Sequence, residues 1–303
     1  MSSSLHPSPF TAPTIGVFDS GFGGLTVLRA LIARVPEARF AFLGDSARLP
    51  YGSKSRRTIA RYAVESARFL VEEQGADYLV IACNTASALA LDAIQDAVPE
   101  VPVLGVIEPG AAAARAASKT GDVLVIATDA TVHSHAYAAA CKAHGLRAIE
   151  KACPLLVPLV EEGWTNHPVT AEVIDIYLNE LRAEAAQRGF NPDTLVLGCT
   201  HYPLLRDLFE QAVRPGVRVI DSAESTADAA QRQFGPQHDG GPILSTPFVE
   251  RVGERSNPAH AASPTPAPQI RCFASDSVEK FERLGSRFLG RPTGNVELVD
   301  LGG

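Results

Sequence analysis

The chain has 303 residues, of which 46% are hydrophobic and 20% charged. This composition is typical of a globular protein and excludes a disordered or collagen-like chain. The formal net charge of −7 disfavours nucleic-acid binding as the main role, because proteins that bind phosphate backbones are normally basic. The length favours two domains of ordinary size, with a core that needs no disulfide or metal.

The chain shows no sign of export or of membrane insertion. Residues 1–13 are rich in Ser and Pro and predict a disordered leader, without the charged and apolar regions of a secretory signal. No stretch reaches the roughly 18 apolar residues of a membrane span, so we expect no membrane partner. The five cysteines form no CxxC pair and are odd in number, which argues against a disulfide framework or zinc site. We therefore expect a reducing cytoplasm.

Short apolar runs alternate with helical patterns along the chain. In chain order, the predicted strands cover residues 14–18, 40–43, 78–82, 101–106, 123–127, 194–197, 217–220 and 270–273. The predicted helices cover residues 24–34, 57–73, 86–98, 134–144, 170–189, 204–213 and 277–288. This alternation predicts an α/β fold, with helices on both faces of a parallel sheet. Such sheets place their active sites at the carboxyl ends of the strands.

Two segments about half the chain apart share one pattern. LVIACNTA begins at Leu79 and LVLGCTHY at Leu195, and each combines a strand, a small residue, a cysteine and a polar residue before a helix. A duplicated unit is one interpretation. The predicted domains are residues 14–107 with 216–303, and residues 108–215. Within the first, the Pro-, Gly- and Ser-rich residues 235–269 predict a flexible insertion.

Polar clusters follow several of the predicted strands, and we expect them to share one pocket. The clusters are Asp19-Ser20-Gly21, Pro50-Tyr51-Gly52, Cys83-Asn84-Thr85 and Cys199-Thr200-His201. The glycine loop that starts at Asp19 lacks the third glycine of a dinucleotide site, and no P-loop is present. The loop is suited to binding a small zwitterion. The alternative is that the loop is only a tight turn that caps the following helix.

Cys83 and Cys199 carry the sharpest chemical signal. Each precedes a predicted helix, whose N-terminus lowers the pKa of a thiol from about 8.5. Two thiols on opposite faces of one carbon can remove a proton and return it from the other side. The alternatives are two inert core cysteines, a Cys–His acyl-transfer pair (Cys199 with His201, or Cys83 with a distant His), and a metal site of Cys83, Cys199 and His201. The pair Cys199 and His201 is disfavoured because residues two apart after a strand usually diverge.

Six stretches, taken together and in order, resemble the glutamate racemases of the cofactor-independent aspartate/glutamate racemase superfamily. They are IGVFDSGFGGLTVL, GDSARLPYG, ACNTASALAL, GVIEPG, ACPLLVPLVEEG and LGCTHYPLL. The resemblance implies two similar doubly wound parallel-sheet domains with the active site in the cleft between them. It further implies L- or D-glutamate as substrate, no cofactor, a supply of D-glutamate for peptidoglycan, and a homodimer.

The resemblance also implies roles for individual residues. Cys83 and Cys199 match the catalytic acid/base thiols, Asp19 and His201 match groups that assist proton transfer, and Glu161 matches a carboxylate near the second thiol. The substrate-binding residues that it implies are Asp19, Ser20, Tyr51, Gly52, Asn84, Thr85, Thr131, Thr200 and His201. Two alternatives remain. One is a racemase or decarboxylase of the same superfamily that acts on another small acid, and the other is a non-catalytic binding protein.

Overall fold

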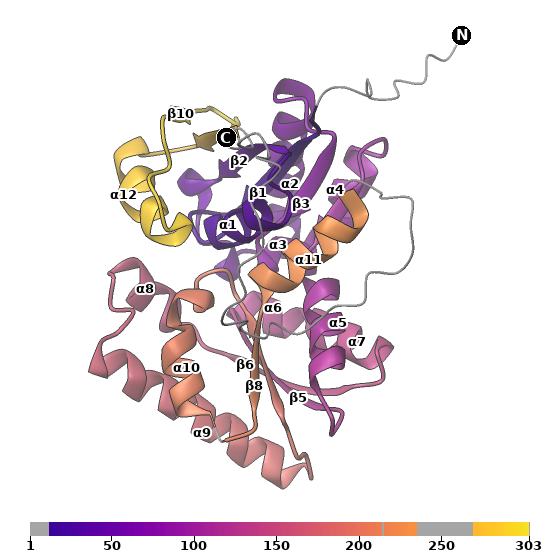
Figure 1. Ribbon diagram of the computed structural model, residues 1–303, viewed down its shortest axis with the longest axis vertical. Helices are drawn as coiled ribbons and strands as arrows, with labels where there is room; N and C mark the ends of the chain where they lie inside the picture. Colours follow the sequence, from indigo (N-terminus) through magenta and orange to yellow (C-terminus); the bar gives the residue numbers. More distant parts are fainter. Residues whose placement is uncertain (1–11, 214, 235–268, 303) are drawn as a thin grey trace, which may run out of the picture.

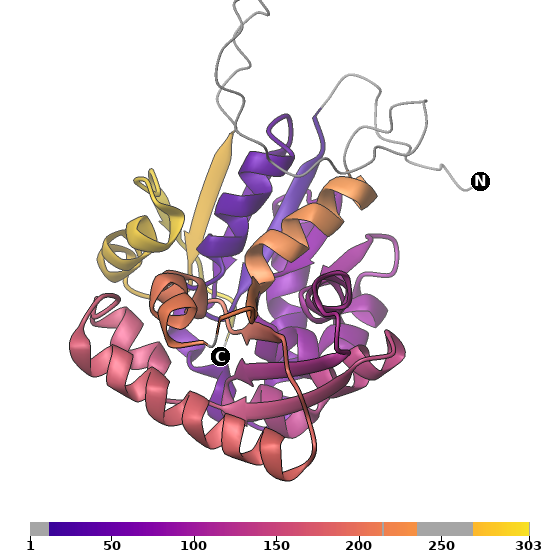
Figure 2. The same cartoon turned by 60° about the horizontal axis from the view of Figure 1, so that its bottom comes forward.

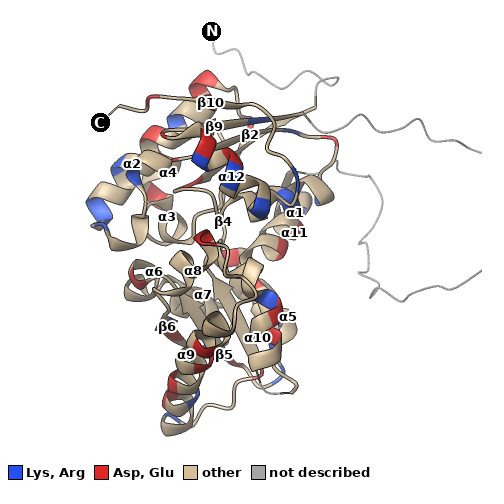
Figure 3. Cartoon of the chain, turned by 90° about the vertical axis from the view of Figure 1, so that its left-hand side faces the viewer, with Lys and Arg blue, Asp and Glu red and all other residues tan. Residues whose placement is uncertain are grey.

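The computed structural model describes residues 12–213, 215–234 and 269–302. The predicted leader, except residues 12 and 13, and the predicted insertion, except Gln269, lie outside the described residues. The described chain forms two lobes, each built on a parallel sheet (Figures 1 and 3). This arrangement confirms the predicted α/β fold with two parallel-sheet units.

The first lobe contains a six-stranded parallel sheet with the strand order β10-β9-β2-β1-β3-β4. Its strands are β1 (Thr14–Asp19), β2 (Arg39–Gly44), β3 (Tyr78–Ile81), β4 (Val103–Gly105), β9 (Ile270–Ala274) and β10 (Val296–Leu298). All of β1 is buried, and Val17 and Phe18 belong to different core clusters. Both faces of the sheet are therefore packed, which explains the continuous apolar run.

The second lobe contains a four-stranded parallel sheet with the order β6-β5-β7-β8. Its strands are β5 (Asp122–Ala127), β6 (Arg147–Ala152), β7 (Thr194–Gly198) and β8 (Arg218–Asp221). The predicted domain boundary at 215/216 assigned β8 to the first domain, but β8 pairs with β7 of the second sheet. The edge strand β6 escaped prediction because its charged residues interrupt the apolar run.

Helices surround both sheets. In the first lobe they are α1 (Leu25–Arg34), η1 (Ser46–Arg48), η2 (Tyr51–Ser53), α2 (Arg56–Arg68), η3 (Phe69–Glu73), α3 (Asn84–Leu89), α4 (Leu91–Ala97) and α12 (Val278–Leu289). The others are α5 (Ile107–Ala117), α6 (Asp129–Ser134), α7 (Ala136–Ala143), α8 (Leu156–Glu161), α9 (Pro168–Gln187), η4 (Tyr202–Leu205), α10 (Arg206–Ala212) and α11 (Ser222–Phe234). Among the described residues, no helix has both the length and the apolar character needed to cross a membrane.

Helix α11 ties the two lobes together. It follows β8 of the second sheet but packs along α1 of the first lobe (Figures 1 and 2). Its buried face carries Ala223, Ala227 and Ala230, whose small side chains permit close packing. At the rim, Arg34 of α1 pairs with Asp228 at 2.7 Å. The sequence analysis missed this helix, although its packing helps to fix the lobes around the space between them.

Candidate active site

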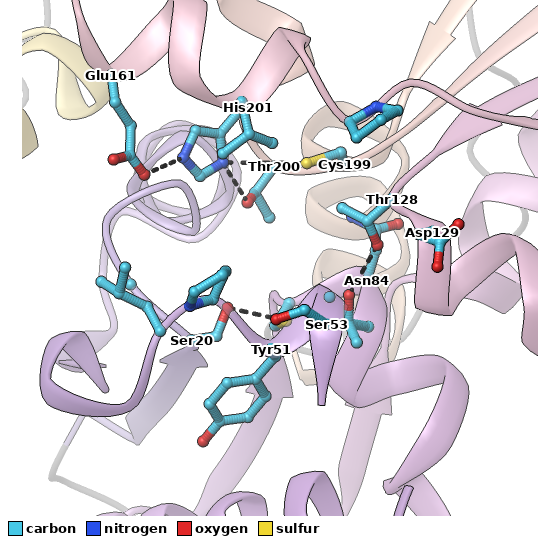
Figure 4. Close-up of a pocket in the computed structure, with 18 of the residues that line it drawn as sticks. Ser20, Tyr51, Ser53, Asn84, Thr128, Asp129, Glu161, Cys199, Thr200 and His201 are labelled. Atoms are coloured by element: carbon cyan, nitrogen blue, oxygen red, sulfur yellow. Dashed lines mark hydrogen bonds and ion pairs between the residues drawn. The ribbon is translucent and has the colours of Figure 1, made fainter. Parts of the chain in front are cut away.

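A cavity of about 310 Å³ lies between the lobes, at the carboxyl ends of strands from both sheets. Ser20 follows β1 and Cys83 lies two residues beyond β3, while Thr128 and Cys199 directly follow β5 and β7. In Figure 4, Ser20, Tyr51 and Ser53 lie on one side of the cavity, with Glu161, His201 and Cys199 on the other. The four predicted polar clusters therefore converge on one cavity, as the carboxyl-end rule predicts.

Most of the expected site residues line this cavity. They are Ser20, Tyr51, Gly52, Cys83, Asn84, Thr85, Glu161, Cys199, Thr200 and His201. Asp19 and Thr131 are not among the lining residues, and both are buried behind the wall. The cavity also includes Thr128 and Asp129, which the sequence analysis missed. The sequence could have indicated both residues, because they directly follow the predicted strand at residues 123–127.

Cys83 caps the N-terminus of α3. Its Sγ accepts a hydrogen bond from the Ala86 amide at 3.4 Å, and its thiol donates to the Ser20 hydroxyl at 3.3 Å. Burial and the nearby Asp19 carboxylate raise the pKa of Cys83 to about 12, despite the opposing hydrogen bonds. The expectation of a lowered pKa is wrong for this cysteine, because desolvation outweighs the helix terminus. Cys83 is a neutral thiol at neutral pH.

Cys199 contacts a histidine that is also bonded to a carboxylate. His201 Nδ1 lies 4.0 Å from Cys199 Sγ, and His201 Nε2 lies 3.2 Å from Glu161 Oε1. The expected divergence of Cys199 and His201 does not occur, because the chain turns sharply between β7 and η4. Burial favours the neutral imidazole, but the bonds to Cys199 and Glu161 raise the pKa of His201 to about 10. His201 is therefore charged at neutral pH, and it presents this charge to the Cys199 sulfur.

Asp19 lies behind the wall that holds Cys83. Its Oδ2 accepts a hydrogen bond from the Gly21 amide at 2.9 Å, whereas its Oδ1 has no partner among the described residues. Burial raises the pKa of Asp19, although the His201 charge and the loop amides oppose that rise. The carboxylate fits because Gly24 has no side chain: a Cβ there would lie 2.4 Å from the Asp19 Cβ.

Threonine and asparagine side chains join the lobes beside the cavity. The Thr85 hydroxyl lies 3.0 Å from that of Thr128 and 3.3 Å from that of Thr131. Asn84 accepts a hydrogen bond from the Tyr137 hydroxyl at 2.7 Å. Thr131 thus contacts Thr85 and Thr128, and Thr128 lies in the cavity wall where Thr131 was expected. These contacts orient the hydroxyl and amide groups before any ligand arrives.

The described residues contain no cluster of three or more His, Cys, Asp or Glu side chains suited to a metal ion. All five cysteines are free and buried. Only Cys83 and Cys199 line the cavity, while the other three are packed elsewhere in the core. The site thus offers two thiols, a charged imidazole, hydroxyls and amides, which is a set suited to proton transfer rather than to metal coordination.

Residues 15–230 match the family model described as Asp/Glu/Hydantoin racemase. A glutamate racemase of Koribacter versatilis is 55% identical over 294 residues, which is 96% of this chain and 98% of that protein. The structure of a glutamate racemase from Francisella tularensis in complex with D-glutamate is similar, with a TM-score of 0.77 and 31% identity over 96% of this chain and 98% of that one. The Escherichia coli glutamate racemase, in complex with L-glutamate and the activator UDP-MurNAc-ala, has a TM-score of 0.68 and 25% identity, covering 96% of this chain and 100% of that one.

Proposed function

Because the chain belongs to the Asp/Glu/Hydantoin racemase family, and is an isomerase of its glutamate racemase branch, we propose that it interconverts L- and D-glutamate by proton transfer at Cα. The observation that carries the proposal is one cavity between two lobes, with Cys83 on the first-lobe side and Cys199 on the second. The relatives whose structures contain D- or L-glutamate support the choice of ligand.

In the proposed reaction, one cysteine removes the Cα proton as a thiolate and the other donates its thiol proton to the opposite face. Cys83 is a neutral thiol at neutral pH, whereas Cys199 faces the charged imidazole of His201. A turnover that starts at Cys199 leaves the proton there and the thiolate at Cys83. Asp19, whose pKa is raised by burial, lies close enough to Cys83 to influence the protonation state of that thiol.

Negative charge that leaves Cα must be held by the α-carboxylate. We assign this carboxylate to Asn84, Thr85 and Thr200, whose side chains reach the cavity from both lobes. Fixed donors in an enclosed site stabilise a developing charge more than mobile water does. Thr131 and Tyr137 support these groups through Thr85 and Asn84. The side chains do not need to reorganise as the charge develops.

The distal carboxylate then lies at the opposite wall. Ser20, Tyr51 and Gly52 offer a hydroxyl and backbone amides there. Aspartate is one methylene shorter and cannot reach both walls together, so we expect discrimination against it. We further propose that the product supplies peptidoglycan synthesis in the cytoplasm and that the active form is a homodimer, both on the family resemblance.

The proposal is tested by incubating the purified protein with L-glutamate in deuterated water, without added cofactor. Circular dichroism should show loss of chirality, and mass spectrometry should find deuterium at Cα of the product. L-Aspartate serves as the matched substrate control. Turnover of aspartate without glutamate would overturn the substrate assignment, and retention of the original hydrogen would overturn the proton-transfer mechanism.

A further inference from the structure

A second hollow opens from the mouth of the catalytic cavity. It has a volume of about 370 Å³ and shares Gly52, Ser53 and Asp129 with that cavity. Lys54 and Arg56 also line it, on the first-lobe side, and Asp129 and His133 line the opposite side. We call it the entrance groove. Because it shares three wall residues with the cavity, a ligand that lies in the groove is adjacent to the proposed carboxylate-binding loop at Tyr51 and Gly52.

Two cations are held on the first-lobe side of this groove. Lys54 Nζ donates to the Pro50 carbonyl at 3.1 Å, and Arg56 Nε donates to the Leu89 carbonyl at 3.2 Å. Carbonyl partners position both side chains without neutralising their charge. Within the part of the chain that the structure describes, neither cation has an ion-pair partner. Asp129, on the opposite wall, lies 3.4 Å from His133. The first-lobe wall therefore keeps a net positive charge.

The stability of α2 does not explain these cations. The helix begins at Arg56 after the cap Ser55, and its first turn contains no acidic residue. A helix N-terminus carries partial positive charge, so basic side chains are unfavourable there and acidic ones are preferred. The helix terminus adds its own positive potential to Lys54 and Arg56. Figure 3 shows basic segments of α2 on the side of the first lobe that lies above α6.

We propose that Lys54 and Arg56 form an electrostatic entrance that draws the anionic substrate toward the catalytic cavity. This inference rests on the proposed function, because glutamate carries two carboxylates and one ammonium at neutral pH. The whole chain has a net charge of −7 and repels such a ligand at long range. The first-lobe wall of the groove carries charge of one sign, and such a lining focuses the local field and raises encounter rates by about 10- to 10³-fold. The entrance groove thus offsets the repulsion at the point where glutamate enters.

The test compares the full chain with Lys54→Gln, Arg56→Gln and the double variant in glutamate racemisation at low and high ionic strength. Arg57→Gln is the matched control, since Arg57 is exposed, follows Arg56 in the same helix and does not line the groove. At low salt, the double variant should lose about tenfold in kcat/KM, with kcat within about twofold of the parent enzyme. The loss should shrink near 0.5 M salt, where screening acts over about 4 Å.

Charge reversal strengthens the test. Lys54→Glu should lose more kcat/KM than Lys54→Gln, and added salt should raise rather than lower its kcat/KM. An unchanged kcat/KM, a loss equal at both salt concentrations, or an equal loss in Arg57→Gln would each overturn the proposal. Failure of the parent enzyme to racemise glutamate would instead overturn the proposed function, so the two failures are distinguishable.

Discussion

Cys199 Sγ and His201 Nδ1 lie 4.0 Å apart, although the two residues are separated by only one position after the end of β7. The same imidazole reaches Glu161 from its other nitrogen, and the Phe288 ring packs against it in a T-shaped arrangement with a centroid separation of 5.0 Å. Among the described residues, Cys83 instead bonds to the Ser20 hydroxyl and the Ala86 amide, and neither partner is a cation. The electrostatic surroundings of the two thiols therefore differ, which suits the two-base proton transfer proposed above.

Replacing either cavity thiol should remove most of the activity. Cys83→Ser and Cys199→Ser should each lower kcat by about 10³-fold, since a hydroxyl is a far weaker acid than a thiol and general acid–base catalysis contributes about 10²- to 10⁴-fold. Steady-state racemisation measures this loss. Cys272→Ser, at a buried cysteine away from the cavity, is the control for folding and should keep its kcat. Full activity in either cavity variant would contradict the two-thiol mechanism.

The raised pKa of His201 predicts a stability that falls as pH rises. Its folded pKa is about 10, against about 6.5 when unfolded, so the charged form contributes fully below pH 6.5. Between pH 6.5 and 10 only the unfolded chain releases the proton, and the free energy of unfolding falls by up to about 1.4 kcal/mol per pH unit. Below about pH 7.5 this effect is separate from that of Cys83, whose thiol has a pKa of about 8.5 in the unfolded chain.

Denaturant unfolding between about pH 6.5 and pH 7.5 measures this slope. His201→Asn should flatten it, whereas His133→Asn, at an exposed histidine, should leave it unchanged. In parallel, Glu161→Gln removes a partner that raises the His201 pKa, so the alkaline limb of kcat/KM should move to lower pH. A slope that is identical in all variants would contradict the assignment of the charge to His201.

Asp45 holds the loop that presents Tyr51 and Gly52 to the cavity. This fully buried carboxylate accepts hydrogen bonds from the Tyr51 hydroxyl at 2.5 Å and from the Ser275 hydroxyl at 2.8 Å. Asp45→Asn should raise KM for glutamate more than it lowers kcat, and should cost about 1–3 kcal/mol of stability. Asp276→Asn, at an exposed carboxylate beside Ser275, is the control and should leave KM unchanged. An unaltered KM in Asp45→Asn would show that the loop keeps its position without this anchor.

Gly23 permits the close approach of the first lobe to the thiol–histidine pair. A Cβ at this position would lie 2.2 Å from Thr200 Oγ1 and 2.6 Å from His201 Nδ1. Gly23→Ala must therefore displace both side chains, and a shift of about 1 Å in a catalytic group costs about 10²-fold in rate. Kinetics and thermal unfolding on the same preparation separate misplacement from misfolding. A variant with unchanged kcat would show that the two lobes can separate slightly without loss of function.

The sequence by itself determined the parallel α/β organisation and most of the cavity wall. The spacing of apolar residues and the polar clusters at strand ends are local patterns that can be read from the sequence. Parallel strands bring their carboxyl ends to the same edge of a sheet, whatever the details of side-chain packing. Ser20, Cys83, Asn84 and Cys199 could be assigned to a common site on this basis. The edge strand β6 was missed because it is only partly buried and its charged residues hide the pattern.

Only the tertiary structure decided the electrostatics and the fine placement of the site. The sequence expectation of a lowered pKa at Cys83 failed because desolvation depends on neighbours from distant segments, Asp19 among them. Thr131 and Thr128 are three residues apart on one turn, and the packing of the lobes, not the motif, decides which of them faces the cavity. Local patterns thus identify which residues converge, whereas burial and cross-lobe contacts set their charge and orientation.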